Sequence, residues 1–92
     1  MMEFIHINSE TNGYIKAVEH DLQIGVITYY WEDEHTIVVD HTEVNPQFEG
    51  RGIGAALVKE IIHYADSQHL KIIPLCPFVK VVLERTGYFK KN

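Results

Sequence analysis

The chain has 92 residues, of which 46% are hydrophobic, and its thirteen acidic and eight basic side chains give a formal net charge of −5. This length allows one domain with a core of modest size, so we expect a single domain over residues 1–92. The acidic balance disfavours binding to nucleic acid, and no segment approaches the roughly 20 consecutive apolar residues that a membrane span needs.

The single cysteine, Cys76, excludes an internal disulfide framework and is typical of a reducing compartment. The N-terminal residues lack the basic region and apolar run of a secretory signal peptide. We therefore predict a cytoplasmic protein.

Four β-rich segments occupy the first half of the chain. They span residues 4–7, 14–18, 22–31 and 36–44, and polar turns separate them. Alternation divides the apolar residues of the third segment between two faces, with Leu22, Ile24 and Val26 on one and Ile27, Tyr29 and Trp31 on the other. Pro46 ends the fourth segment because proline has no N–H to donate to a ladder. The pattern predicts an antiparallel meander.

A glycine-rich loop follows, and an amphipathic helix begins within it. Gly50, Gly52 and Gly54 occupy alternate positions, which frees the backbone where a turn must wind into a helix. The helix is indicated by an apolar stripe at three- and four-residue spacing, made of Ile53, Leu57, Ile61, Tyr64 and Ala65. Its N-terminus directs unpaired N–H groups and a partial positive charge outward, so a phosphate is the ligand that we expect there.

The chain after this helix predicts one more strand and one more helix. Residues 70–76 are typical of a buried strand, which a right-handed crossover can place parallel to the strand before the loop. Pro74 within it belongs at an edge or where two strands part. Pro77 begins a second helix that runs to Arg85, and Gly87 ends it. The predicted fold class is α+β, with about five strands and two helices.

Three kinds of phosphate-binding loop compete for the glycine-rich segment. A Walker loop is excluded because no Gly-Lys-Ser/Thr follows. A dinucleotide fingerprint needs Gly-x-Gly-x-x-Gly within a larger parallel sheet, whereas the spacing here is Gly-x-Gly-x-Gly. The remaining interpretation is a loop after an antiparallel meander whose amides hold a pyrophosphate.

The segment from His41 to Val58, HTEVNPQFEGRGIGAALV, resembles the coenzyme A-binding motif of the GNAT superfamily of N-acetyltransferases. The resemblance places Gly52 and Gly54 at the motif's two glycine positions and Glu49 at a position that is usually Gln or Arg. With the short length and the run Cys-Pro-Phe-Val at 76–79, the chain is similar to small single-domain members of the YjdJ type. Such a domain splays its last two strands to admit the pantetheine arm of acetyl-CoA.

The resemblance also implies which residues bind the cofactor. Backbone amides from Gly50 to Ala55, including those of Arg51 and Ile53, form the pyrophosphate cradle, and an amide near Val44 or Asn45 donates to the thioester carbonyl. The side chain of Arg51 either neutralises a phosphate or is simply solvated. No His, Cys or carboxylate spacing indicates a metal site, so acetyl-CoA is the only cofactor that we predict.

Three side chains are candidates for catalysis. Many members of the superfamily use a tyrosine of the last helix as the acid, but the comparable position here is Leu83. Cys76 can replace it, either as a nucleophile that carries the acetyl group or as the acid, unless it is only a small buried residue. His41 and Glu43 share one strand face and either relay a proton or make structural hydrogen bonds.

We therefore predict an acetyl-CoA-dependent N-acetyltransferase that acts on a primary amine of a small molecule or a protein, as a monomer or a homodimer. Two alternatives stay open: a non-catalytic acyl-CoA-binding module, and a protein-interaction domain that keeps the fold without the ligand.

Overall fold

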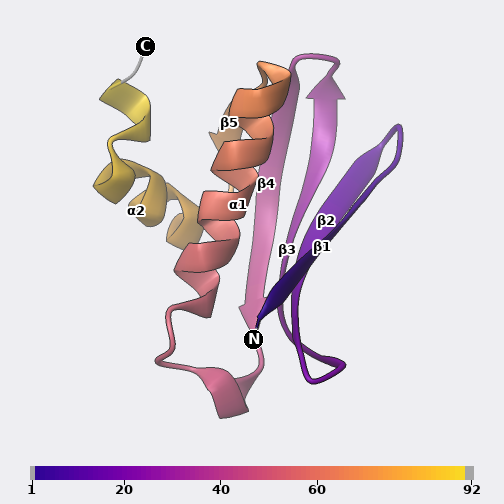
Figure 1. Ribbon diagram of the computed structural model, residues 1–92. Coiled ribbons are helices and arrows are strands. Elements are labelled where there is room, and N and C mark those ends of the chain that lie inside the picture. The colour runs from indigo at the N-terminus through magenta and orange to yellow at the C-terminus, as the bar shows by residue number, and fades with distance from the viewer. Residues whose placement is uncertain (1, 91–92) are drawn as a thin grey trace.

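The computed structural model describes residues 2–90 and contains one five-stranded sheet that curves around a central helix (Figure 1). The strands follow chain order across the sheet and are β1 (Glu3–Asn8), β2 (Asn12–Glu19), β3 (Leu22–Asp33), β4 (Thr36–Val44) and β5 (Lys71–Pro74). The helices are α1 (Ile53–Gln68) and α2 (Pro77–Thr86), with 3-10 turns η1 (Pro46–Phe48) and η2 (Tyr88–Lys90). The predicted α+β class and order of elements are confirmed.

Strands β1 to β4 pair antiparallel, as predicted, but a bulge in β3 changes which residues face the core. Ala17 pairs with Gly25 while Val18 pairs with Gln23, so Ile24 is an extra residue in β3. A bulge breaks the two-residue alternation. Ile24 is therefore buried in the same core as Ile27, whereas Leu22 is 47% exposed. The expectation that Leu22, Ile24 and Val26 share one face was wrong for this reason.

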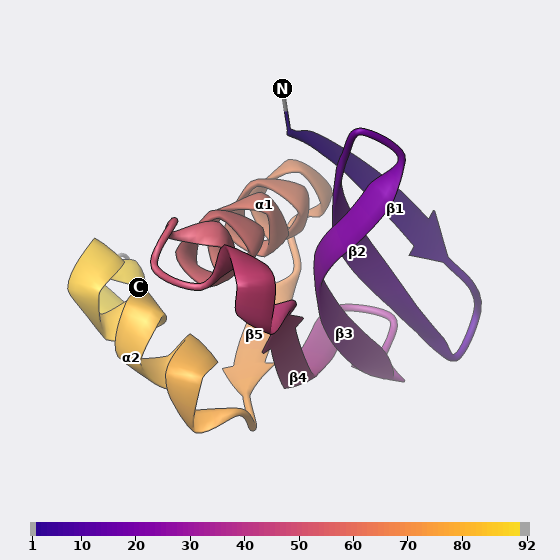
Figure 2. The same cartoon turned by 90° about the horizontal axis from the view of Figure 1, so that it is seen from below.

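Helix α1 packs on the concave face of the sheet. Its buried residues are Ile53, Gly54, Leu57, Val58, Ile61, Ile62 and Ala65. Gly25 lets the helix approach β3 closely, because a Cβ there would lie 3.0 Å from Ile53 Cγ2 and 3.2 Å from Leu57 Cδ1. Seen from below, α2 lies beyond β5 and flanks α1, and neither helix covers the convex face of the sheet (Figure 2).

Strands β4 and β5 run parallel and then separate. Their register runs from Thr36 opposite Lys71 to Val39 opposite Pro74, while β4 continues to Val44. Beyond Pro74, the amides of Leu75 and Cys76 both donate to Val39 O, at 2.9 and 3.2 Å. Pro74 thus stands where the two strands part, which is one of the two places predicted for it. The last part of β4 borders a gap that β5 has left.

The C-terminal segment closes the outer edge of β5. Gly87 ends α2 in the left-handed conformation, with φ 76°, as predicted. The next residue, Tyr88, is buried, and its hydroxyl oxygen accepts a hydrogen bond of 3.1 Å from Ile72 N–H. An amide at an edge that would otherwise lack a partner is thereby satisfied.

Candidate active site

A cavity of about 300 Å³ lies where the glycine-rich loop leads into α1. It is lined by Val44, Phe48, Glu49, Gly50, Gly52, Ile53, Gly54, Ala55 and Phe78. Val44 comes from the end of β4 and Phe78 from the first turn of α2, so the cavity borders the gap between the separated strands. A larger hollow of about 720 Å³ lies at the opposite end of β4, beside the β3–β4 turn, but four carboxylates line it, those of Glu10, Glu32, Asp33 and Glu34. That hollow repels an anionic ligand.

The backbone of the loop takes conformations that only glycine adopts without strain. Gly50 and Gly52 have φ of 86° and 76°, with no atom within 4 Å of a Cβ built on either. Gly52 is the N-cap of α1, and no side chain caps the helix start. The first N–H groups of α1 therefore remain available to a ligand, and the helix dipole favours an anion there.

Gly54 shapes the cavity wall in a different way. It is helical, and a Cβ would lie 2.9 Å from Phe78 Cζ and 3.7 Å from Val44 Cγ2. The small residue keeps α1 and α2 close together at the cavity wall. The sequence pattern predicted a glycine-rich cradle but gave no sign that Phe78 would form its other side.

Among residues 2–90, Glu49 is the one that lines the cavity with an ionisable side chain. Arg51, beside it in the chain, is turned to another partner: its Nη1 and Nη2 donate to Glu19 Oε1 and Oε2, at 2.9 and 3.1 Å. The hydrogen bond from Arg51 lowers the pKa of Glu19, and Glu19 raises the pKa of Arg51. Neither of the alternatives considered for Arg51 included this carboxylate, which comes from the end of β2.

Cys76 lies at the point where β5 leaves β4. It is half-buried against the core and is the N-cap residue of α2, without a side-chain cap hydrogen bond. Its own N–H donates to Val39 O, which holds it next to the β4 segment that contains His41. The structure thus brings Cys76 to the edge of the gap.

His41 and Glu43 lie on the face of β4 that no helix covers. They pair with Thr28 and Val26, and both side chains are exposed. The intervening Thr42 pairs with Ile27, a core residue, so its side chain points to the α1 side. The two candidates share a face, as predicted, and that face is the opposite of the one on which the cavity lies.

The two amides expected to meet the thioester differ in direction. Asn45 N–H donates to Ile24 O at 2.8 Å, toward β3. Successive amides along a strand point to opposite sides, so Val44 N–H points toward the gap. Of the two residues, Val44 is therefore the one whose N–H faces the gap between β4 and β5.

An unsatisfied hydroxyl supports the idea that a polar ligand enters this gap. Within residues 2–90, the Thr42 Oγ1 is the buried side-chain polar atom that has no hydrogen-bond partner. A buried hydroxyl without a partner costs about 1–3 kcal/mol, and this one lies on the α1 side of the separated part of β4. The amides of the pantetheine arm are partners of suitable chemistry. Sequence reasoning gave Thr42 no role, because a threonine in a strand is ordinary.

None of the helices within residues 2–90 is long and apolar enough to cross a membrane. That part of the chain also contains no group of three or more His, Cys, Asp or Glu side chains that could hold a metal ion.

Comparison with known proteins identifies the family. Residues 13–91 match the sequence model of a family described as GCN5-related N-acetyl-transferase. The solution structure of a GCN5-like putative N-acetyltransferase from Staphylococcus aureus is 31% identical, with a TM-score of 0.66, and the match covers 94% of this chain and 83% of that one. A search of curated protein sequences gives no match.

Two more distant crystal structures share the fold. A GNAT family acetyltransferase from Elizabethkingia anophelis, with acetyl-CoA bound, is 21% identical with a TM-score of 0.67, and the match covers 89% of this chain and 63% of that one. A ribosomal-protein-alanine N-acetyltransferase from Brucella melitensis biovar Abortus is 19% identical with a TM-score of 0.70, covering 84% and 62%. The chain thus spans less than two thirds of the length of these two enzymes. It belongs to the GCN5-related N-acetyltransferase family.

Proposed function

We propose that this protein, acting as one domain, transfers an acetyl group from acetyl-CoA to a primary amine of a small molecule or a protein. The observation that carries the proposal is the cavity between Val44, the start of α1 and Phe78, which joins an uncapped helix N-terminus to the gap between β4 and β5. A phosphate fits the first part and an extended arm fits the second. The acetyl-CoA bound by the Elizabethkingia relative supports the choice of ligand.

The pyrophosphate is held by backbone N–H groups of Gly50 to Ala55, those of Arg51 and Ile53 included. Because the described part of the chain places no unpaired cation in the cavity lining, amides and the helix dipole supply the attraction. The amide of Val44 and the Thr42 hydroxyl serve the arm within the gap, and the adjoining Asn45 holds the end of β4 to β3. Acetyl-CoA supplies an activated thioester whose carbonyl carbon accepts the amine.

The amine approaches from the uncovered face of the sheet. His41 and Glu43 lie there, and either can take the proton that the amine nitrogen loses when its new bond to the acetyl carbon forms. The leaving thiolate needs a proton in turn, and the buried Leu83 at the family's tyrosine position has none to give. We assign this role to Cys76, which lies at the edge of the gap and carries an ionisable thiol.

Two roles for Cys76 lead to different products. As an acid, its thiol protonates the leaving thiolate and the acetyl group passes directly to the amine. As a nucleophile, its thiolate takes the acetyl group first, releases coenzyme A, and then gives the group to the amine. Only the second role leaves a protein with the mass of one extra acetyl group.

The test combines intact-mass measurement with release of free coenzyme A. Wild-type protein, Cys76→Ala, Cys76→Ser and His41→Gln are incubated with acetyl-CoA and a panel of primary amines, with the exposed His63→Gln on α1 as the control for His41. We expect wild type and His63→Gln to release more than one equivalent of coenzyme A per protein only when an amine is present, and His41→Gln to be about 10²-fold slower, as for a general base. Full activity of Cys76→Ala would exclude both roles of Cys76.

The buried Leu83 also favours a second candidate, a module that binds acyl-CoA without catalysis. In that case acetyl-CoA raises the melting temperature of the wild-type protein, and the rise increases with the logarithm of the acetyl-CoA concentration above the dissociation constant. Release of coenzyme A then never exceeds that of Cys76→Ser with any amine. If no coenzyme A derivative changes the melting temperature, neither function holds.

A further inference from the structure

The pairing of Arg51 with Glu19 connects the glycine-rich loop to a rigid part of the sheet. Glu19 is the last residue of β2 and pairs with Leu22 across a two-residue turn, His20-Asp21, in which both residues have positive φ. Such a turn matches the twist of the strands and fixes the hairpin tightly. The carboxylate at the end of β2 therefore has a well-defined position.

The loop itself has few other restraints. Asn45 Oδ1 accepts from Gln47 N–H at the start of η1, and Phe48 N–H donates to Asn45 O at 2.8 Å. Between Glu49 and the start of α1, the chain passes through Gly50 and Gly52, which have no side chains to anchor them and no atom within 4 Å of a built Cβ. The side chain of Arg51 is the anchor of this stretch.

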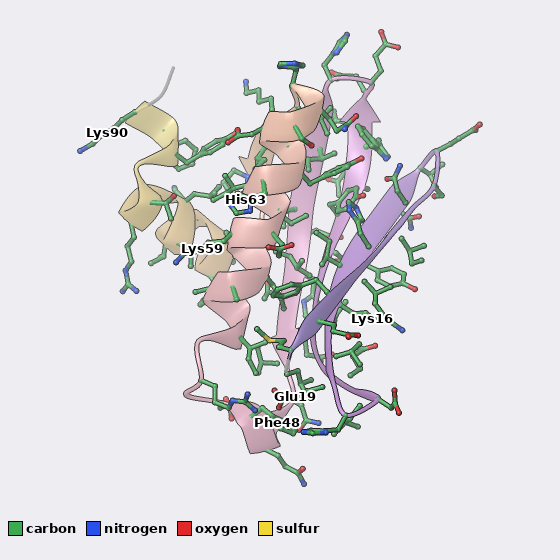
Figure 3. The ribbon with its side chains drawn as sticks, in the orientation of Figure 1. Lys16, Glu19, Phe48, Lys59, His63 and Lys90 are labelled. Carbon is green, nitrogen blue, oxygen red and sulfur yellow. The ribbon has the colours of Figure 1, made fainter. Side chains whose placement is uncertain are left out.

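The geometry of the contact is that of a strong ion pair. Each terminal nitrogen of Arg51 donates to a different carboxylate oxygen of Glu19, and bidentate pairs of this kind fix orientation as well as distance. The Glu19 side chain is only 15% exposed, against 46% for Arg51. The guanidinium also lies over the ring of Phe48, 5.5 Å from its centroid, and Phe48 lines the cavity. Figure 3 shows Glu19 and Phe48 close together beside η1.

We propose that Glu19 is a positioning residue for cofactor binding, which acts through Arg51 to hold the amides of Gly50 to Gly52 in place for the pyrophosphate. The inference rests on the function proposed above. In this arrangement the Arg51 side chain binds the β2–β3 hairpin. The loop then contacts the pyrophosphate through its backbone N–H groups and not through the guanidinium. A direct contact between the guanidinium and a phosphate would make Glu19 a competitor instead, and the two arrangements predict opposite effects of removing the carboxylate.

The experiment measures dissociation constants of acetyl-CoA and of acetyl-pantetheine, which has the arm but lacks the pyrophosphate and the nucleotide. The proteins are wild type, Glu19→Gln, Arg51→Gln and the double variant, with Glu10→Gln as a control that changes the net charge equally at an exposed site in another hairpin. We expect Glu19→Gln and Arg51→Gln each to weaken acetyl-CoA binding by about fivefold, the upper range for a partly exposed ion pair. The double variant should be no weaker than either single one, because both remove the same contact.

Acetyl-pantetheine separates loop positioning from general loss of structure. Its dissociation constant should be the same for all five proteins, since it does not reach the loop, whereas a damaged fold would weaken both ligands. Equal or tighter binding of acetyl-CoA by Glu19→Gln would overturn the role of Glu19 while leaving the cofactor site intact. If wild-type protein binds neither ligand, the cofactor assignment fails and this inference fails with it.

Discussion

The substitution Gly13→Ala tests whether a close contact between β2 and Tyr29 governs the stability of the sheet. A Cβ at Gly13 would lie 2.5 Å from Tyr29 Cζ and 2.7 Å from the backbone oxygen of Ile7. The backbone atom cannot give way, and Tyr29 is 1% exposed, so neither neighbour has free space. Real Cβ atoms do not approach other atoms this closely, so either Tyr29 or β1 must move.

The hydrogen bonds of Tyr29 add to the cost. Its hydroxyl donates to Asn8 Oδ1 at 2.8 Å, which means that His6 Nε2–H, 2.7 Å away, donates to the hydroxyl oxygen. Overpacking costs about 1–3 kcal/mol, and each of the two hydrogen bonds contributes about 0.5–1.5 kcal/mol. We therefore expect Gly13→Ala to lower the free energy of unfolding by about 4 kcal/mol, close to half of the total for a domain of this size. The melting temperature should fall by about 15–30 °C.

Urea unfolding provides the assay, because Trp31 is the only tryptophan and its Nε1 donates to Asn8 Oδ1 at 3.0 Å, beside the disturbed contact. Gly87→Ala is the matched control. Gly87 has φ 76° but no atom within 4 Å of a built Cβ, so this substitution costs only the strain of placing alanine at positive φ, about 1 kcal/mol. The reasoning is refuted if Gly13→Ala costs no more than Gly87→Ala, since steric contact would then not be the cause.

Three other predictions concern the site and the edges of the fold. Gly54→Ala adds a methyl group against the Phe78 ring, which is 44% exposed and can turn, so the free energy of unfolding should change by less than about 1 kcal/mol. The dissociation constant of acetyl-CoA, measured by calorimetric titration, should rise about tenfold. Tyr88→Phe leaves the Ile72 N–H buried without an acceptor and should cost about 1–3 kcal/mol in urea unfolding. Burial lowers the pKa of His6 below 6.5, so the unfolded chain binds its proton more readily and stability is lost as the pH falls from 6.5 toward the folded pKa. His6→Gln, which keeps an N–H donor, should reduce this loss of melting temperature between about pH 7 and pH 5, and an unchanged pH profile would contradict it.

The proposed site has to bind an anionic cofactor in an acidic protein. A net charge of −5 opposes binding at long range, and the ion pair with Glu19 leaves Arg51 with no unbalanced charge. In our proposal the attraction for the phosphate is local and comes from the amides at the start of α1 and around Gly50 and Gly52. Glu49 adds a negative charge to the cavity lining, so the proposed binding depends all the more on the backbone.

Local patterns were sufficient for the order of the elements and for the position of the glycine-rich loop. Runs of β-branched residues, the apolar stripe of α1 and the stops at Pro46 and Gly87 act within a few residues of the chain, so the sequence alone determined the four-strand meander, the crossover helix and the parallel last strand. The need for glycine at 50 and 52 is likewise a property of the local backbone, which takes positive φ at both.

Only the tertiary structure decided which distant groups meet. The partnership of Glu19 with Arg51 and the contact of Phe78 with Gly54 join residues far apart in the chain, and each depends on how the sheet and the two helices pack. The bulge at Ile24 is nearer in the chain, but it is a feature of how β2 pairs with β3. The same packing left the Thr42 hydroxyl without a partner and put His41 and Glu43 on the face opposite the cavity. Burial and contact between elements are properties of the whole fold, and a pattern that repeats every two or four residues carries no information about them.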